Sequence, residues 1–131
     1  MRDMEQVYLP VGDDDWGIIV NYDYDERDFH RLSAIMDSFG MSRKSIDKAL
    51  NILSNYNTGM AVSRDDLKMT AIFISKCSDP SQFWSTLNHE LYHANVAIID
   101  YYGKPYDEEE AAYTQGELMR QAVIKIGLPC Y

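Results

Sequence analysis

Residues 69–102 read MTAIFISKCSDPSQFWSTLNHELYHANVAIIDYY. The first part, Met69–Ser75, is short, mostly apolar and rich in residues that favour strands, so it predicts a β-strand. Asp79 then suits a helix N-cap, and the proline that follows it suits the first position of a helix. The stretch therefore predicts a strand followed by one long helix over Pro80–Tyr102.

The predicted helix carries the motif H-E-x-x-H. His89 and His93 are four residues apart, so they lie on one face of a helix, one turn from each other. Two imidazoles placed in this way can both reach one Zn²⁺ ion at about 2.0–2.1 Å. Glu90 lies about 100° further round the helix, where it can take a proton from a zinc-bound water that attacks an amide carbonyl. The motif predicts a hydrolytic zinc site, and the plain alternative is a helix surface that bears two histidines and a glutamate.

A second helix with an acidic first turn follows the motif. Asp107, with Glu110 three residues later, fits a capping box. Acidic residues in a first turn also complement the helix dipole without binding anything. A catalytic zinc site needs a third protein ligand and an open position for water. The start of this last helix is the best source of that ligand in the chain.

The two helices resemble those of the gluzincin metallopeptidases. In that family H-E-x-x-H is followed by a second helix with a glutamate ligand in an E-x-x-A-[D/N] type motif. The run Glu109-Glu110-Ala111-Ala112-Tyr113 matches E-x-x-A, with tyrosine where many members have Asp or Asn. The chain also looks like small HExxH proteins of phage and mobile elements and, more distantly, the ImmA/IrrE-type metallopeptidases. The resemblance covers about residues 69–126.

The resemblance implies a role for each matching residue. It implies His89 and His93 as zinc ligands, Glu109 as the third ligand and Glu90 as the general base. Tyr113 would support the ligands or donate to the oxyanion that forms on the substrate. The cofactor implied is Zn²⁺, and the substrate implied is a peptide or a protein.

Simple geometry favours a different third ligand. In a straight antiparallel helix pair folded about residues 104–105, His93 lies level with Gly116, and Glu109 lies roughly 10 Å away along the axis. Glu117 would be much nearer, while Glu110 is expected to serve the capping box. A glycine inside a helix costs about 1 kcal/mol relative to alanine, so Gly116 predicts a close approach of the two helices there.

Two further residues could bind a metal by their type alone. Cys77 lies upstream of the motif, as does the cysteine ligand of peptide deformylases, but Ser75-Lys76-Cys77-Ser78 differs from their signature. A buried or idle thiol is the favoured interpretation of Cys77. His30 lies far from the motif and is expected at the surface.

The N-terminal half predicts a strand, two helices and a further short strand. The strand is Trp16–Val20, between acidic turns at Asp13–Asp15 and Asp23–Glu26. Apolar residues recur every three or four positions from Asp25 to Phe39, which predicts an amphipathic helix. Ser42 caps the next helix, and Met60–Val62 can form a short strand. We therefore expect one α+β domain over residues 1–131, with a small mixed or antiparallel sheet, about four helices and a zincin-like strand–helix–helix at its C-terminus.

Composition narrows the classes of partner. The 131 residues include 46% hydrophobic residues, which is enough for a buried core. Twelve basic and 21 acidic residues give a net charge of −9. This balance argues against binding to nucleic acid or to an anionic membrane, and no apolar run is long enough to span a bilayer. Cys77 and Cys130 make no disulfide framework, and no secretory segment is evident, so we expect reduced thiols in the cytoplasm.

Two hypotheses of function follow. The first is a zinc metallopeptidase whose strand Met69–Ser75 presents an open edge to an extended substrate. The second is an inactive zincin-type module of a phage or mobile element that recognises or regulates a partner without turnover.

Overall fold

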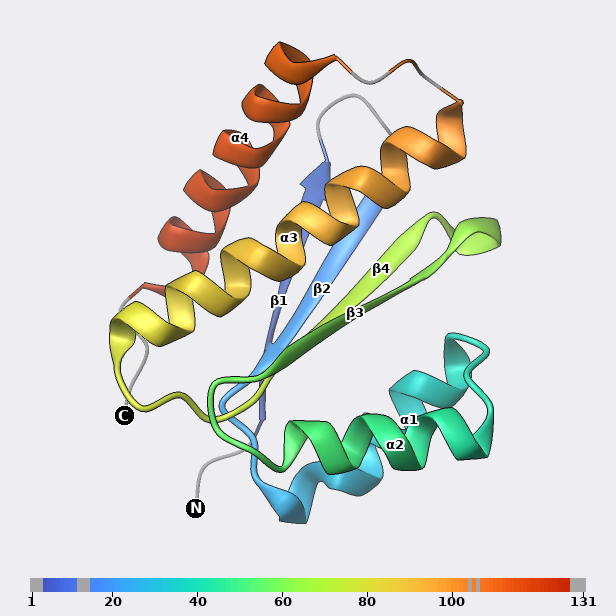
Figure 1. Ribbon diagram of the computed structural model, residues 1–131, viewed down its shortest axis with the longest axis vertical. Helices are drawn as coiled ribbons and strands as arrows, with labels where there is room; N and C mark the ends of the chain where they lie inside the picture. Colours follow the sequence, from blue (N-terminus) through green and yellow to red (C-terminus); the bar gives the residue numbers. More distant parts are fainter. Residues whose placement is uncertain (1–3, 12–14, 104, 106, 128–131) are drawn as a thin grey trace.

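The computed structural model describes residues 4–11, 15–103, 105 and 107–127, and it has a four-stranded sheet with helices on both faces (Figure 1). The order across the sheet is β1-β2-β4-β3, where the strands are β1 (Glu5–Val11), β2 (Trp16–Tyr22), β3 (Gly59–Arg64) and β4 (Met69–Ile74). The β2 strand runs parallel to β4, and both edge strands are antiparallel to their neighbours. The predicted α+β class, with a small mixed sheet and four helices, is confirmed.

Two helical layers cover the sheet because β4 is apolar on both faces. Ile72 and Ile74 belong to the core cluster under α3 (Pro80–Tyr102) and α4 (Glu108–Ile126). Ala71 and Phe73 alternate with them and belong to the cluster under α1 (Phe29–Ser38) and α2 (Arg43–Leu53). Successive residues of a strand point to opposite faces, so one unbroken apolar run supplies both cores.

The long helix has the bounds that its sequence predicts. The side chain of Asp79 accepts a hydrogen bond from the backbone N–H of Gln82, and α3 begins at Pro80. Gly103 follows the last residue with φ of 63°, a left-handed conformation that favours glycine. Ser42 likewise caps α2 by accepting from the N–H of Ser45, as predicted.

The N-terminal half differs from the prediction in two elements. The first strand, β1, was not among the predicted elements. It contains Pro10 and lies at an edge of the sheet, where proline is tolerated. The predicted helix from Asp25 begins as a 3-10 turn, η1 (Glu26–Asp28), which Asp25 caps, and only then becomes α1. The acidic residues Asp13 and Asp14 lie outside the described residues, as does Cys130.

The two C-terminal helices share one face of the sheet. The α3 helix lies over β3 and β4, and α4 packs against α3 and β1 (Figure 1). Gln121 and Lys125 on α4 donate hydrogen bonds to the carbonyl oxygens of Pro10 and Tyr8 at 3.0 and 2.5 Å. Within the part of the chain that the structure describes, no helix is both long and apolar enough to cross a membrane.

Candidate metal centre

The two histidines of the motif converge on the exposed side of α3. Their Nε2 atoms are 3.1 Å apart, and the ring centroids are 4.7 Å apart with an interplanar angle of 79°. Both side chains are exposed, because the opposite side of α3 is the one that Leu87, Leu91 and Ala94 bury against the sheet. Two nitrogen atoms that each lie about 2.0–2.1 Å from one tetrahedral ion are about 3.3–3.4 Å apart. The pair is therefore within a few tenths of an ångström of the spacing that zinc requires.

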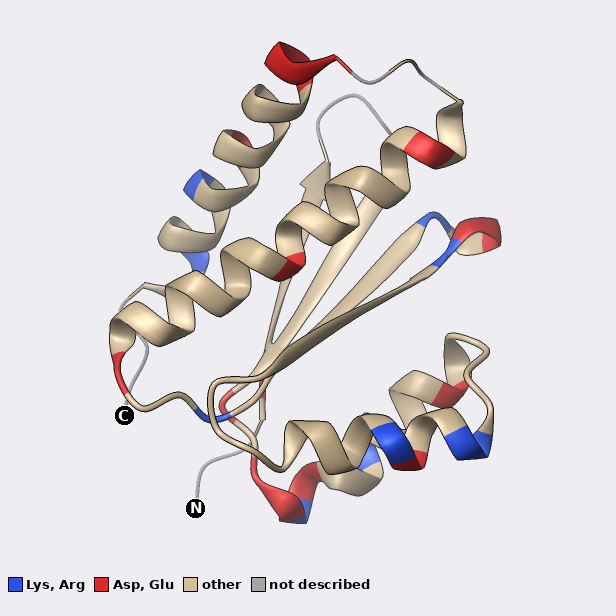
Figure 2. Cartoon of the chain, viewed as in Figure 1, with Lys and Arg blue, Asp and Glu red and all other residues tan. Residues whose placement is uncertain are grey.

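Glu90 occupies a different environment from the histidines. It is 6% exposed and is one of only two charged residues in α3, as Figure 2 makes visible along the helix. Burial raises the pKa of Glu90 above its usual value, and the neighbouring His89 and His93 act in the opposite direction. The site thus combines two accessible ring nitrogens with a sheltered carboxyl group one residue away.

The shelter for Glu90 comes from the start of β3. A Cβ atom placed on Gly59 would lie 3.1 Å from Cγ of Glu90, 3.2 Å from its Oε2 and 2.8 Å from Cγ2 of Thr86. Glycine at this position lets the strand backbone approach α3 closely enough to cover Glu90. No role was predicted for Gly59, although a glycine in a strand is a known sign of close backbone approach.

Amide side chains set how α4 lies against α3. The Nε2 of Gln115 donates to the carbonyl oxygen and to the side-chain oxygen of Asn88, at 3.1 and 2.8 Å. The Nδ2 of Asn95, which is buried, donates to the carbonyl oxygen of Ala111 at 3.0 Å. His93 lies between the two asparagines along α3, so it is level with residues 111–115 of α4. The straight helix pair expected from the sequence placed His93 level with Gly116, so the observed register is shifted by one to five residues toward the start of α4.

The structure does not bring Glu109 and Tyr113 to the histidine pair. Glu109 lies two to six residues before the stretch that is level with His93, or roughly 3–9 Å along the helix axis. Each of the two residues is two positions from Ala111, which is buried, so each is turned about 200° away from the packed side of α4. Glu109 is exposed and Tyr113 is 77% exposed. The roles that the resemblance implies for them stay predictions.

The alternative glutamate ligands also lie apart from the pair. Glu117 forms an ion pair with Arg120 at 2.8 Å, and this contact lowers the pKa of Glu117. Glu110 is exposed in the first turn of α4, where its backbone N–H donates to Asp107. Among the described residues, no group of three or more His, Cys, Asp or Glu side chains is placed to hold a metal ion. The histidines therefore supply two ligand positions in this conformation.

Three other sequence-based expectations can be compared with the structure. Cys77 is half-buried against the core, and burial together with Asp79 raises its pKa to about 11, in agreement with an idle thiol. His30 is exposed on α1, as expected. The predicted close approach at Gly116 is wrong, since nothing lies within 4 Å of the place where its Cβ would be.

The expectation that the strand Met69–Ser75 has a free edge is wrong. The strand Met69–Ser75 was expected to present a free edge, but β4 is paired on one side with β2 and on the other with β3. The free edge on this side of the sheet belongs to β3, whose six residues are all half-buried. Pairing order is decided by contacts between distant segments, so the local pattern of the strand did not reveal it.

Comparisons with protein-family models, with curated proteins and with solved structures found no match to this chain. What the site can do therefore follows from its own residues and their geometry. Neutral imidazoles at His89 and His93 can donate lone pairs to one soft or borderline cation, and the site is open to water.

Proposed function

We propose that this chain is a zinc-dependent hydrolase of peptide bonds that acts through its H-E-x-x-H helix. The single observation that carries the proposal is the 3.1 Å convergence of the His89 and His93 Nε2 atoms beside the sheltered Glu90. The donor set fits Zn²⁺, which prefers nitrogen ligands in tetrahedral geometry. A zinc ion held there supplies a water of lowered pKa and polarises the carbonyl of the scissile bond.

Glu90 is the proposed general base. Its carboxylate accepts the proton of the attacking water and then delivers that proton to the leaving nitrogen of the amide. Burial favours the neutral form of a carboxyl group and so moves its pKa toward the working range of a proton shuttle. The backbone of Gly59 lies next to this carboxyl group on the strand side.

The substrate in this proposal is a peptide or a protein segment in extended conformation. The free edge of β3 offers backbone N–H and C=O groups to an added strand, and β3 packs directly against α3. A net charge of −9 steers basic substrates toward the chain and repels nucleic acid. Main-chain pairing gives little sequence preference, so the charge is the main source of selectivity.

Glu109 is the proposed third ligand, with Tyr113 as a donor to the developing oxyanion. Both side chains are exposed on the outer side of α4, so this role requires the first turns of α4 to rearrange when zinc binds.

A second candidate function is a zinc-binding module that recognises a partner without turnover. The outward positions of Glu109 and Tyr113 favour this candidate. They leave two protein ligands for zinc, whereas a catalytic zinc site has three. Both candidates suit a reducing compartment, and we propose the cytoplasm. The free thiol of Cys77 supports that assignment.

The first experiment is zinc per chain by elemental analysis of tag-free protein. We expect near-stoichiometric zinc in the unaltered chain, loss of zinc in His89→Ala and His93→Ala, and no loss in His30→Ala. His30→Ala is the matched control because His30 is exposed and lies on another helix. Zinc that persists after removal of both motif histidines, or no zinc after its addition at neutral pH, would overturn the metal site.

The second experiment separates the two candidates. Glu90→Gln keeps the shape of the side chain but cannot accept a proton, so a hydrolase should lose cleavage of a fluorogenic peptide library while it retains zinc. A binding module would hold zinc and show no cleavage in either form. Glu109→Ala and Glu117→Ala then identify the third ligand, because only loss of a true ligand lowers the affinity for zinc.

A further inference from the structure

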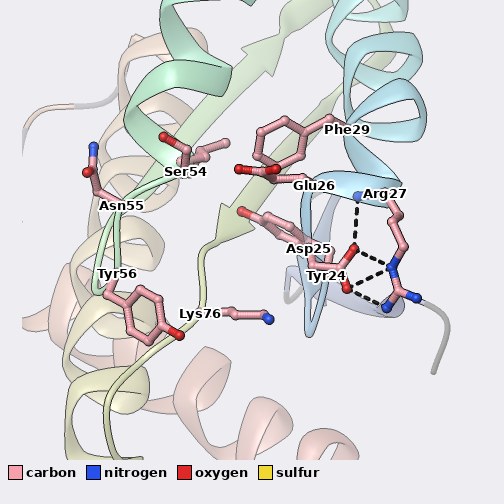
Figure 3. Close-up of a pocket in the computed structure, with 10 residues that line it drawn as sticks. Tyr24, Asp25, Glu26, Arg27, Phe29, Ser54, Asn55, Tyr56 and Lys76 are labelled. Carbon is pink, nitrogen blue, oxygen red and sulfur yellow. Dashed lines mark hydrogen bonds and ion pairs between the residues drawn. The ribbon is translucent and has the colours of Figure 1, made fainter. Parts of the chain in front are cut away.

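Figure 3 shows a cavity of about 340 Å³. Its residues Tyr24, Phe29 and Leu53 belong to the core cluster on the α1–α2 side of the sheet, and the histidine pair lies on α3 on the other side. The walls of the cavity come from three segments that are far apart in the sequence: residues 24–29 after β2, residues 53–56 at the end of α2, and Lys76 after β4. Because β2 and β4 are parallel neighbours, the cavity lies outside the carboxyl ends of two adjacent parallel strands. Open sheets with parallel strands commonly bind ligands at such a place.

One wall of the cavity carries a polar group that lacks a partner. Tyr24 is 3% exposed, and its hydroxyl has no hydrogen-bond partner among the described residues. The hydroxyl points toward the space between Ser54 and Lys76 in Figure 3. Burial raises the pKa of Tyr24, so the group stays protonated and can donate as well as accept. Buried polar groups in folded proteins are nearly always paired, so an orphaned hydroxyl facing a cavity indicates a missing partner.

The cavity is preformed by contacts that hold its walls together. The backbone N–H of Asn57, next to the wall residue Tyr56, donates to the carbonyl oxygen of Lys76 at 2.8 Å. The hydroxyls of Thr58 and Ser75 are 3.0 Å apart, which ties the same loop to the end of β4. On the other wall, Asp25 accepts from the backbone N–H and the guanidinium of Arg27. Sites for small molecules are usually largely formed before the ligand arrives.

The charges on the walls balance. The lining includes two carboxylates, Asp25 and Glu26, and two cations, Arg27 and Lys76, and Asp25 pairs with Arg27. Neither Glu26 nor Lys76 forms an ion pair with any other described residue. In Figure 3 their charged groups lie on either side of the Tyr24 hydroxyl. Because Asp25 and Arg27 neutralise each other, an anionic ligand would still meet the carboxylate of Glu26, and a cationic ligand would still meet the ammonium group of Lys76.

From these observations we infer that the cavity binds a small zwitterion of amino-acid type, with its ammonium group toward Glu26 and its carboxylate toward Lys76. The Tyr24 hydroxyl bonds to the bound molecule and is thereby satisfied. Apolar walls at Phe29 and Leu53 suit a ligand with an apolar or aromatic side chain. This site does not depend on the zinc chemistry, because the sheet separates it from His89 and His93.

The test is a titration of ¹⁵N-labelled protein followed by NMR, with free phenylalanine and free leucine as probes. We expect the amide signals of residues 24–29, 53–56 and 76 to shift at millimolar concentrations of one or both probes. The N-acetylated and the amidated forms of the same amino acid each lack one charge, and we expect each to bind at least about tenfold more weakly. No shift in these signals, or equal binding of the blocked forms, would overturn the proposal.

Variants assign the contacts. Tyr24→Phe removes only the hydroxyl, and we expect ligand affinity to fall about three- to tenfold without loss of thermal stability. Tyr92→Phe, at an exposed tyrosine on α3, is the matched control. Lys76→Gln should abolish the preference for the free acid over the amide, whereas Lys48→Gln on α2 should leave it intact. A preference that survives Lys76→Gln would show that the carboxylate does not bind there and would overturn the assigned orientation.

Discussion

The packing of β3 against α3 predicts that a single methyl group at Gly59 destabilises the protein. The added Cβ in Gly59→Ala would lie 2.8 Å from Cγ2 of Thr86, closer than real Cβ contacts occur, and 3.1 Å from Cγ of Glu90. Thr86 is β-branched and sits in a helix, so its methyl group has few other positions. Overpacking of this kind costs about 1–3 kcal/mol. Replacing glycine also reduces the entropy of the unfolded chain, which offsets about 0.4–1 kcal/mol. We therefore expect a net loss of about 1–2 kcal/mol.

The measurement is the free energy of unfolding from urea denaturation. It is compared with a control variant whose free energy of unfolding should rise instead of fall. Gly116→Ala is the matched control, because nothing lies within 4 Å of the place where its Cβ would be. An exposed glycine inside a helix costs about 1 kcal/mol relative to alanine, so this variant should gain about that amount. Gly59→Ala should lower the urea midpoint while Gly116→Ala raises it, with similar m-values in both.

The opposite result at Gly59 would refute the reasoning. If Gly59→Ala is as stable as the unaltered chain while Gly116→Ala is stabilised, then β3 does not approach α3 as closely as described. The shelter of Glu90 would then also be incorrect, since it depends on the same contacts. A stabilised Gly59→Ala together with an unchanged Gly116→Ala would contradict both placements.

Three further predictions concern single side chains. The pKa of Asp25 should be about 2, because Arg27 donates hydrogen bonds to its carboxylate. Since this pKa is below the ordinary value, the contact stabilises the fold above about pH 4, and that stabilisation is lost as the pH falls toward 2. In Arg27→Gln, the pKa of Asp25 measured by NMR should return toward 3.8. The Cys77 thiol, with a pKa of about 11, should react with iodoacetamide at neutral pH more slowly than a free cysteine when measured in a Cys130→Ser background; a rate like that of free cysteine would contradict its burial. Asn95→Leu removes the hydrogen bond from Asn95 to the carbonyl oxygen of Ala111, which keeps its helical bond from the N–H of residue 115, so the variant should cost about 0.5–1.5 kcal/mol in urea denaturation. An unchanged urea midpoint would contradict a contribution of this contact to stability.

The C-terminal half was the more predictable part of the fold. The helix over Pro80–Tyr102 has the predicted bounds because its signals are local: an aspartate cap, a proline at the first position and a glycine after the last. Strand β1 was not predicted. Its Pro10 is compatible with a strand only at an edge of the sheet. Whether a segment lies at an edge depends on which strands pair, and no local pattern reports that.

The candidate site also has one part that local sequence predicts and another part that depends on contacts between distant segments. His89 and His93 were placed together by helical periodicity alone, since four residues make slightly more than one turn. The shelter of Glu90 depends on Gly59, which is 31 positions earlier in the chain and reaches α3 only through the sheet. The direction in which Glu109 and Tyr113 point depends on which side of α4 is buried, and that side is chosen by packing against α3 and β1.

The sequence by itself determined the class of fold, the bounds of the long helix and the pairing of the two histidines. Each of these follows from contacts between residues no more than a few positions apart, where backbone geometry leaves little choice. Only the tertiary structure decided the strand order, the free edge at β3, the cover over Glu90 and the cavity that Tyr24 and Lys76 share. Those features join segments separated by tens of residues, and their free energy comes from burying surfaces that do not meet until the chain is folded.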